Sequence, residues 1–129
     1  MADTLIVTGS RHDVPTTVRR LTAALDARGI RLFAVIDHAA GAAEAGLELP
    51  EEVVLIFGAP RVGTLLMQAD PRAGLDLPLR TLVWSDGGTT RVAFHDPRTL
   101  AADFTLTDRS DTLTALHDLL HHLVRDATT

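Results

Sequence analysis

Runs of apolar residues divide the chain into strand-like and helix-like segments. Leu5 to Val7 begins a short apolar run that predicts a first strand. Asp13 then offers an N-cap, with Pro15 in the first turn of a segment whose apolar residues recur at helical spacing. Gly29 supplies a C-terminal stop. This pattern predicts a strand followed by a helix of about 14 residues.

Two further runs, Leu32 to Ile36 and Val53 to Phe57, are continuously apolar. Continuous apolar runs are typical of strands buried on both faces, which predicts that these two strands are central in the sheet. The stretch between them, Ala39 to Leu49, is rich in Ala and Gly, and Pro50 closes it. Its composition fits either a short helix or an ordered loop.

The next segments contain turn signals. Val62 to Ala69 predicts a short helix, and the prolines and glycine of Asp70 to Pro78 predict an irregular loop. Leu79 to Ser85 and Thr90 to His95 are strand-like runs separated by the turn Asp86-Gly87-Gly88-Thr89. They predict a β-hairpin that closes one edge of the sheet.

A final amphipathic helix is predicted from Ser110, an N-cap with Asp111 in the first turn. Its apolar stripe consists of Leu113, Leu116, Leu120, Leu123 and Val124. The element order is therefore β-α-β-β-α-β-β-α. This order predicts an α+β fold with helices on one face of the sheet, because strict β and α alternation would have indicated a parallel doubly wound sheet.

Composition indicates a globular chain with no nucleic-acid partner. Of the 129 residues, 46% are apolar and 22% charged, which predicts one domain over residues 1–129. A net charge of −5, one Trp, four Phe and no Tyr disfavour nucleic-acid binding. No apolar run approaches the roughly 18 residues of a spanning helix, and Met1 to Ser10 lacks signal-peptide features. We therefore expect no membrane partner and a cytoplasmic location.

Missing residue types exclude several chemistries. The chain has no Cys, Lys, Tyr or Asn. Thiolate nucleophiles, cysteine metal sites, Schiff bases and the phosphate-loop lysine are therefore excluded. None of the three serines lies in a G-x-S-x-G motif. Any chemistry must use His, Asp, Glu, Arg or Thr, and the sequence requires no cofactor.

Several short motifs occur together in one order. They are Ile36-Asp37-His38-Ala39-Ala40, Ile56-Phe57-Gly58-Ala59-Pro60, Gly63-Thr64, Asp76-Leu77-Pro78-Leu79 and Asp96-Pro97. In order and spacing they resemble the domain of unknown function 302 family, from about the first helix to about Phe104. The resemblance implies an α+β fold similar to the TATA-binding-protein-like arrangement of helices over a curved, antiparallel sheet. It is compatible with a homodimer and implies no established activity.

The chain departs from the family's usual pattern at two positions. Ala59 stands where an amide residue is common, and Leu65 stands where proline is frequent. If the amide binds something in relatives, the loss of its hydrogen-bonding groups alters the corresponding site in this chain.

Asp37 and His38 follow a buried apolar strand, a position at which side chains commonly line a pocket. One interpretation is a ligand or proton-transfer site with His38 as general acid/base and Asp37 or Glu44 as its partner. The other is structural, with Asp37 capping the following segment, because neighbours in a strand point to opposite faces. A metal site is a further hypothesis, for which His38, Glu44 and His95 are the candidate ligands.

The segment Gly58 to Thr64 follows a strand and has the glycine spacing of a phosphate loop. Thr64 stands where that motif needs Lys, and Pro60 removes an N–H group, so nucleotide hydrolysis is disfavoured. Two interpretations are left: a weaker anion site with Arg61 nearby, or a tight turn in which glycines permit close packing.

His117 and His121 lie four residues apart on the predicted last helix, a spacing that can chelate a metal. Without the Glu of the zincin motif this spacing is unspecific, and a solvated edge of the helix is the preferred interpretation.

These observations predict a small-molecule-binding or anion-binding domain whose pocket lies between Asp37-His38 and Gly58-Thr64. The candidate ligand-binding residues are Asp37, His38, Gly58, Pro60, Arg61, Gly63 and Thr64. The alternatives are an enzyme that uses His38, with or without a metal, and a structural or protein-interaction module.

Overall fold

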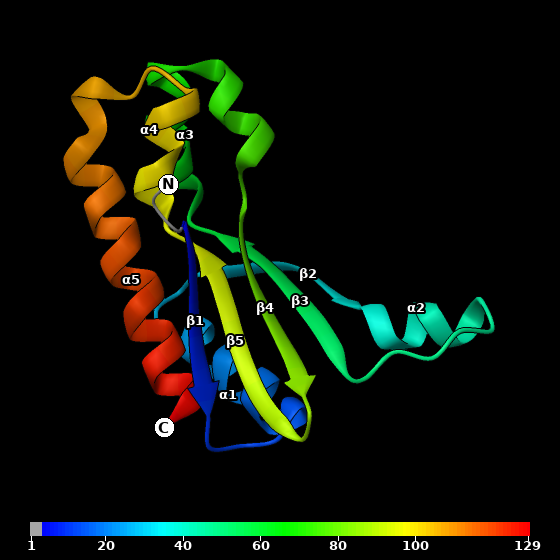
Figure 1. Cartoon of the computed structure of the whole chain (residues 1–129). Helices are drawn as coiled ribbons and strands as arrows, with labels where there is room; N and C mark the ends of the chain where they lie inside the picture. The colour runs from blue at the N-terminus through cyan, green and yellow to red at the C-terminus, as the bar shows by residue number, and fades with distance from the viewer. Residues whose placement is uncertain (1–3) are drawn as a thin grey trace.

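The computed structural model describes residues 4–129, and these form one curved antiparallel sheet with helices around it (Figure 1). The five strands are β1 (Leu5–Ser10), β2 (Arg31–Asp37), β3 (Glu52–Gly58), β4 (Leu79–Asp86) and β5 (Thr89–His95). Their order across the sheet is β1-β5-β4-β3-β2, and every neighbouring pair is antiparallel. The predicted α+β fold is confirmed.

Helices connect and cover the strands. The α-helices are α1 (Val14–Ala27), α2 (His38–Glu44), α3 (Pro60–Ala69), α4 (Leu100–Asp103) and α5 (Ser110–Thr128). The 3₁₀ helices are η1 (Pro71–Asp76), η2 (Pro97–Thr99) and η3 (Thr107–Arg109). The predicted order therefore lacked α2 and α4. Of the two interpretations of the Ala39 to Leu49 stretch, the helix is correct for its first half.

Local signals set several helix and turn boundaries. The Asp13 carboxylate accepts a hydrogen bond from the Thr16 N–H at 2.9 Å and so caps α1, as predicted. Gly29, just after α1, and Gly87 and Gly88, in the β4–β5 turn, adopt positive φ values. The N-cap prediction at Ser110 is wrong, because this residue is already the first of α5.

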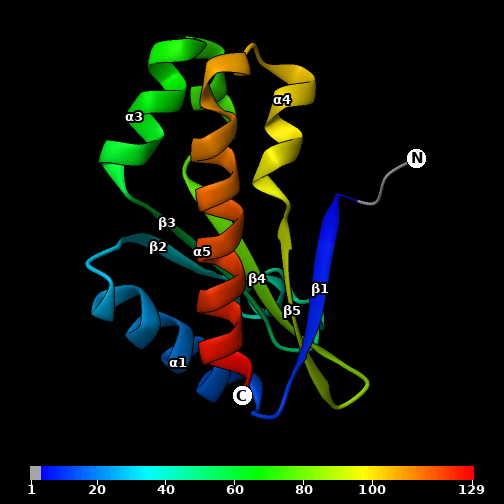
Figure 2. The same cartoon turned by 90° about the vertical axis from the view of Figure 1, so that its left-hand side faces the viewer.

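The main core lies between the sheet and the helices α1 and α5, which cover the same face (Figures 1 and 2). Leu21 and Leu25 of α1 and Leu120 of α5 are fully or almost fully buried there. They pack with Leu55 and Phe57 of β3, the inward residues of that strand. Burial of each such side chain contributes roughly 1.5–3 kcal/mol, which accounts for the position of the helices.

Two predictions about the sheet are wrong. The strand β2 is an edge strand, and its side chains Phe33, Val35 and Ile36 are each more than 40% exposed. The β4–β5 hairpin lies inside the sheet, because β1 pairs with β5 across about eighty residues of chain. An apolar run shows that a segment is hydrophobic but not whether a neighbouring strand covers it.

The prediction of an irregular loop from Asp70 to Pro78 is also wrong, because most of this segment forms the 3₁₀ helix η1. The Asp70 carboxylate starts this helix by accepting from the Arg72 N–H at 3.0 Å. A second, smaller core joins η1 and α3 to the first half of α5. Its buried members are Leu66, Ala73, Leu106, Leu113 and Leu116.

The face of the sheet opposite α1 and α5 carries no covering helix in the part of the chain that the structure describes, apart from the start of α2 at its rim (Figure 1). We call it the open face, with Val54, Leu82, Trp84 and Ala93 as its floor. The helix α2 projects beyond the sheet and has no buried residue (Figure 1). Within residues 4–129, no helix is long and apolar enough to cross a membrane.

Candidate functional site

The two segments predicted to form one pocket lie at opposite ends of the β2–β3 pair. Asp37 is opposite Val53, whereas Gly58 is opposite Arg31 at the other end of the pair. Gly58 lies five positions after Val53 along β3, a distance of about 17 Å at roughly 3.4 Å per residue. The predicted shared pocket is therefore wrong. Consecutive strands here are antiparallel, so the end of one lies beside the start of the next.

At the first of these ends, Asp37 acts as a cap. Its carboxylate accepts a hydrogen bond from the Ala40 N–H at 2.9 Å and begins α2. His38 is exposed at the rim of the open face and has no polar partner among residues 4–129. Glu44 lies at the far end of α2 from His38. The capping interpretation of Asp37 is confirmed, while the general acid/base role of His38 stays a prediction.

At the other end, the segment Gly58 to Thr64 is not a phosphate-binding loop. The helix α3 begins at Pro60, and the N–H groups of Val62 and Gly63 donate to the Ala59 carbonyl at 2.9 and 3.0 Å. These N–H groups are used inside the helix and do not form an open cradle for an anion. The segment is one wall of a cavity.

This cavity has a volume of about 230 Å³ and lies between α3, η1 and the ends of β3 and β4. Four of the predicted ligand-binding residues, Gly58, Pro60, Gly63 and Thr64, line it. The other lining residues are Phe33, Ala59, Val62, Met67, Gly74, Leu77, Pro78, Leu79 and Leu116. The exposed side chain of Arg61 is not part of the wall. The predicted anion site with Arg61 therefore lacks its cation.

The wall of the cavity is apolar, and Thr64 carries the one hydroxyl group among the lining side chains. Glycines leave the space open. A Cβ atom at Gly63 would lie 3.8 Å from Met67 Cε and 3.9 Å from Leu77 Cδ1, at ordinary contact distance. At Gly58 it would lie 3.4 Å from the ring of Phe33. Side chains at these positions would narrow the cavity without any change in the backbone.

Hydrogen bonds to the buried Asp70 carboxylate hold the η1 wall of the cavity in place. The Asp70 carboxylate accepts from the Thr105 N–H at 2.8 Å and from the Arg72 guanidinium at 2.8 and 3.1 Å. These hydrogen bonds, first of all those from Arg72, hold the pKa of Asp70 well below its ordinary value. Asp70 thereby ties the start of η1 to a segment 35 residues further along the chain.

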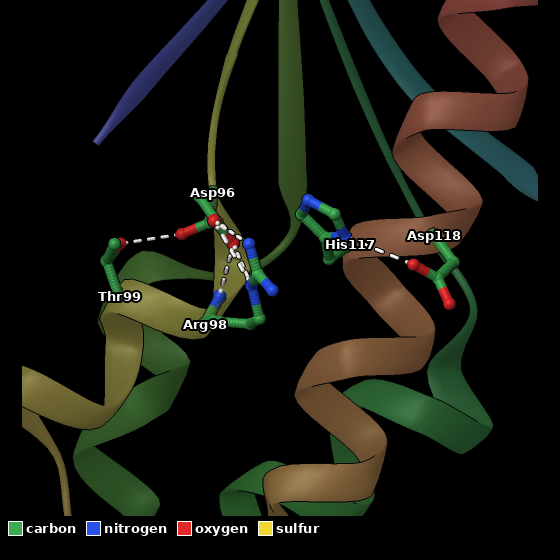
Figure 3. Close-up of polar contacts among 5 residues, drawn as sticks. All are labelled: Asp96, Arg98, Thr99, His117 and Asp118. Carbon is green, nitrogen blue, oxygen red and sulfur yellow. Dashed lines mark hydrogen bonds and ion pairs between the residues drawn. The ribbon is translucent and has the colours of Figure 1, made fainter. Parts of the chain in front are cut away.

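A second polar cluster lies between the end of β5 and α5 (Figure 3). The Asp96 carboxylate accepts hydrogen bonds from the Arg98 N–H and guanidinium, which lower the pKa of Asp96. His117 Nδ1 lies 3.1 Å from the carboxylate of Asp118. Each pair is formed by residues close in sequence, and Arg98 is half exposed. The cluster therefore consists of local caps and ion pairs at the surface.

Two histidines of α5, His117 and His121, pack against each other. The rings of His117 and His121 have centroids 4.4 Å apart, and His121 lies edge-on to Phe94 at 5.5 Å. Burial, and after it the charge of His117, lowers the pKa of His121. Among residues 4–129 no group of three or more His, Asp or Glu side chains is arranged to hold a metal. The candidate ligands His38, Glu44 and His95 are not brought together.

Part of the cavity could not be found from the sequence. Phe33, Met67, Gly74 and Leu116 come from four separate elements, and nothing in their spacing indicates that they meet. The Asp76 to Leu79 motif was the available signal, since Leu77, Pro78 and Leu79 all line the cavity.

These features define a class of α+β domain with an apolar cavity at one end of an antiparallel sheet. The sequence model of the family described as "Domain of unknown function DUF302" matches residues 6–123. The chain therefore belongs to the DUF302 family. It is also similar in fold to an uncharacterized conserved DUF302 protein from Bacillus stearothermophilus, with a TM-score of 0.90 at 17% identity. That match covers 98% of this chain and 99% of the solved chain.

The chain is also similar to part of longer proteins from Brucella. It is 44% identical over 108 residues to "Fluoride-specific ion channel FluC 1" of Brucella suis biovar 1, and it has the same identity to a protein of that name from Brucella abortus biovar 1. Each match covers 83% of this chain but only 42% or 40% of the relative. The chain thus spans about two fifths of the length of these relatives.

Proposed function

We propose that this domain binds a small, largely apolar molecule in the cavity beside α3. The observation that supports it is a glycine-lined, apolar space of about 230 Å³ with a single hydroxyl group, Thr64, in its wall. Ligand sites are usually apolar concavities with few polar groups, which fix the orientation of the ligand. A cavity of about 150 Å³ lined by aliphatic and aromatic residues accepts benzene, so this one suits a substituted ring.

The apolar wall also limits the class of ligand. No lining side chain is charged, so the desolvation of an anion would not be offset by an opposite charge. Of the two ligand classes predicted from the sequence, we therefore favour a small molecule over an anion. The expected ligand presents one hydrogen-bonding group toward Thr64 and otherwise apolar surface.

The chain itself offers a reporter for this cavity. It has only two methionines, Met1 and Met67, and Met67 lines the cavity. In protein labelled with ¹³C at the methionine methyl groups, toluene and phenol serve as probes. We expect either probe to shift the Met67 methyl signal in a saturable way, because a bound ring contacts that methyl group.

Two leucine substitutions separate binding from general effects. Gly63→Leu places a side chain into the cavity and should abolish the shift. Gly41→Leu in α2 is the control and should keep the shift, because no atom lies within 4 Å of the Cβ position of Gly41. The thermal unfolding of both variants confirms that they are folded. If neither probe moves the Met67 signal of the unaltered protein, the proposed function fails.

The Brucella relatives favour a second candidate function, in which the domain acts alongside a fluoride channel. The support is the 44% identity over 108 residues to proteins named as such channels. The test is fluoride efflux from proteoliposomes that contain the Brucella suis relative, either whole or without the portion similar to this chain. A change in efflux that this chain restores when added back supports the idea. Equal efflux from both forms removes it.

A further inference from the structure

The open face of the sheet is an apolar groove with charged ends. Val54 and Leu82 form the middle of its floor, and Trp84 is half-buried beside them. The groove has a volume of about 430 Å³. Leu5, Val7 and Ile36, which are opposite His95, Ala93 and Val54 in the strand register, extend this face and are each more than 40% exposed. Adjoining exposed apolar side chains mark an interaction surface.

The two ends of the groove carry opposite charges. Glu52 is opposite Trp84 in the β3–β4 register, and Arg80 is opposite Ile56. Arg80 therefore lies four positions along the strands from the level of Glu52, a distance of about 13 Å. His95 lies with Arg80 at the basic end. Arg91 lies in the same row as Glu52, opposite Trp84, but it is paired with Asp86 at 2.8 Å. Among residues 4–129 neither Glu52 nor Arg80 forms an ion pair.

This arrangement is self-complementary. Consider a two-fold axis that lies in the plane of the open face and runs across the strands at the level of Val54 and Leu82. Rotation about it turns a second open face onto the first and reverses the strand direction. The Glu52 end of one copy then meets the Arg80 end of the other, and this contact occurs twice. Such reciprocity is the property of an isologous dimer interface.

We propose that a second copy of this chain covers the open face, with Glu52 of each protomer paired to Arg80 of its partner. The interface buries Val54 and Leu82 at its centre and Trp84 beside Glu52. An apolar centre bordered by charge pairs is the common anatomy of a specific interface. The charge pattern selects a second copy over an unrelated partner because each charged end finds its complement on an identical surface.

The projecting helix α2 fits the same assembly. Its residues are not buried in their own chain, and Leu47, which follows it, is 66% exposed. The proposed rotation keeps the β2 edges of both copies on the same side of the dimer. There the α2 segment of one copy can cover Ile36 of the other, which is opposite Val54 of the open face and is 43% exposed.

Charge reversal tests this pairing directly. In sedimentation velocity we expect the full chain to sediment with twice the mass of 13.9 kDa. Glu52→Arg alone and Arg80→Glu alone each create two like-charge contacts per dimer and should weaken association roughly 100-fold or more. An equimolar mixture of the two variants should dimerise again, because one contact is then native and the other is reversed. Only a second copy can produce this rescue.

Matched controls and an independent signal accompany the test. Asp103→Arg and Arg61→Glu make the same charge changes away from the open face and should leave the dimer unchanged. Trp84 is the one tryptophan of the chain, so its emission should shift to longer wavelength when the dimer dissociates. A monomer at every concentration would overturn the proposal and assign the face to a different protein. A mixture of the folded variants that stays monomeric would overturn it equally.

Discussion

Replacement of Gly63 by alanine should stabilise the domain and weaken ligand binding at the same time. Gly63 lies inside α3 and does not have a positive φ, so alanine fits the backbone. The new Cβ would contact Met67 and Leu77 at 3.8 and 3.9 Å, without a clash. Glycine inside a helix costs about 1 kcal/mol relative to alanine, so the free energy of unfolding should rise by about 1 kcal/mol.

For a chain of 129 residues, that gain corresponds to an increase in Tm of about 4 °C. The assay is urea unfolding followed by circular dichroism, together with the Met67 methyl titration with phenol. We expect weaker phenol binding in Gly63→Ala, because the added methyl group occupies part of the cavity. The expected rise in stability together with a fall in phenol affinity is informative, because a variant that merely loosens the fold would lose both stability and affinity.

Gly41→Ala in α2 is the matched control. This position also lies inside a helix, but nothing stands within 4 Å of its Cβ position. It should leave phenol binding unchanged. A loss of stability in Gly63→Ala, or equal phenol affinity in Gly63→Ala and the unaltered protein, would refute the described geometry of the cavity.

Three further predictions concern polar groups. Asp70→Asn should destabilise the domain at pH 7. The pKa of Asp70 is lower in the folded than in the unfolded state, so its carboxylate stabilises the fold fully above the unfolded value of about 3.9, and this contribution is lost as the pH falls toward the folded-state pKa. The free energies of unfolding of the two proteins, measured with urea, should therefore converge in acid. A difference that stays constant with pH would contradict this role. Asp37→Ala should cost about 1 kcal/mol locally in α2. Hydrogen exchange at Ala40 should accelerate while the global Tm hardly changes, and a large fall in Tm would show that α2 has a structural role beyond its own turn. NMR titration should place the pKa of His121 below its ordinary value of 6.5. The contribution of neutral His121 to the stability of the fold is then lost as the pH falls from 6.5 through the folded-state pKa. A raised pKa would contradict the packing against His117.

The sequence was sufficient for several local boundaries, because these depend on neighbouring residues. Asp13, Gly29 and the Gly87-Gly88 turn each determine a boundary through their own backbone or side-chain chemistry, and each prediction is confirmed. The pairing of β1 with β5 depends on contacts across about eighty residues. No residue in either strand signals that pairing, and the strand order was therefore wrong.

The candidate site shows the same division. The Gly58 to Thr64 segment was correctly selected as distinctive, and most of it lines the cavity. The partner chosen for it, Asp37-His38, was wrong because the antiparallel register of β2 and β3 puts the two segments at opposite ends. Met67 and Leu116 complete the wall through tertiary packing alone, which periodicity cannot reveal.

The most direct test of the proposed function is an isotope-filtered nuclear Overhauser measurement on the methionine-methyl-labelled protein with phenol bound. The structure predicts contacts between the ring protons of phenol and the Met67 methyl group, and none between phenol and the indole of Trp84 on the open face. Contacts to Met67 that disappear in Gly63→Leu would place the ligand in the cavity beside α3. Contacts to Trp84 instead, with none to Met67, would contradict the account.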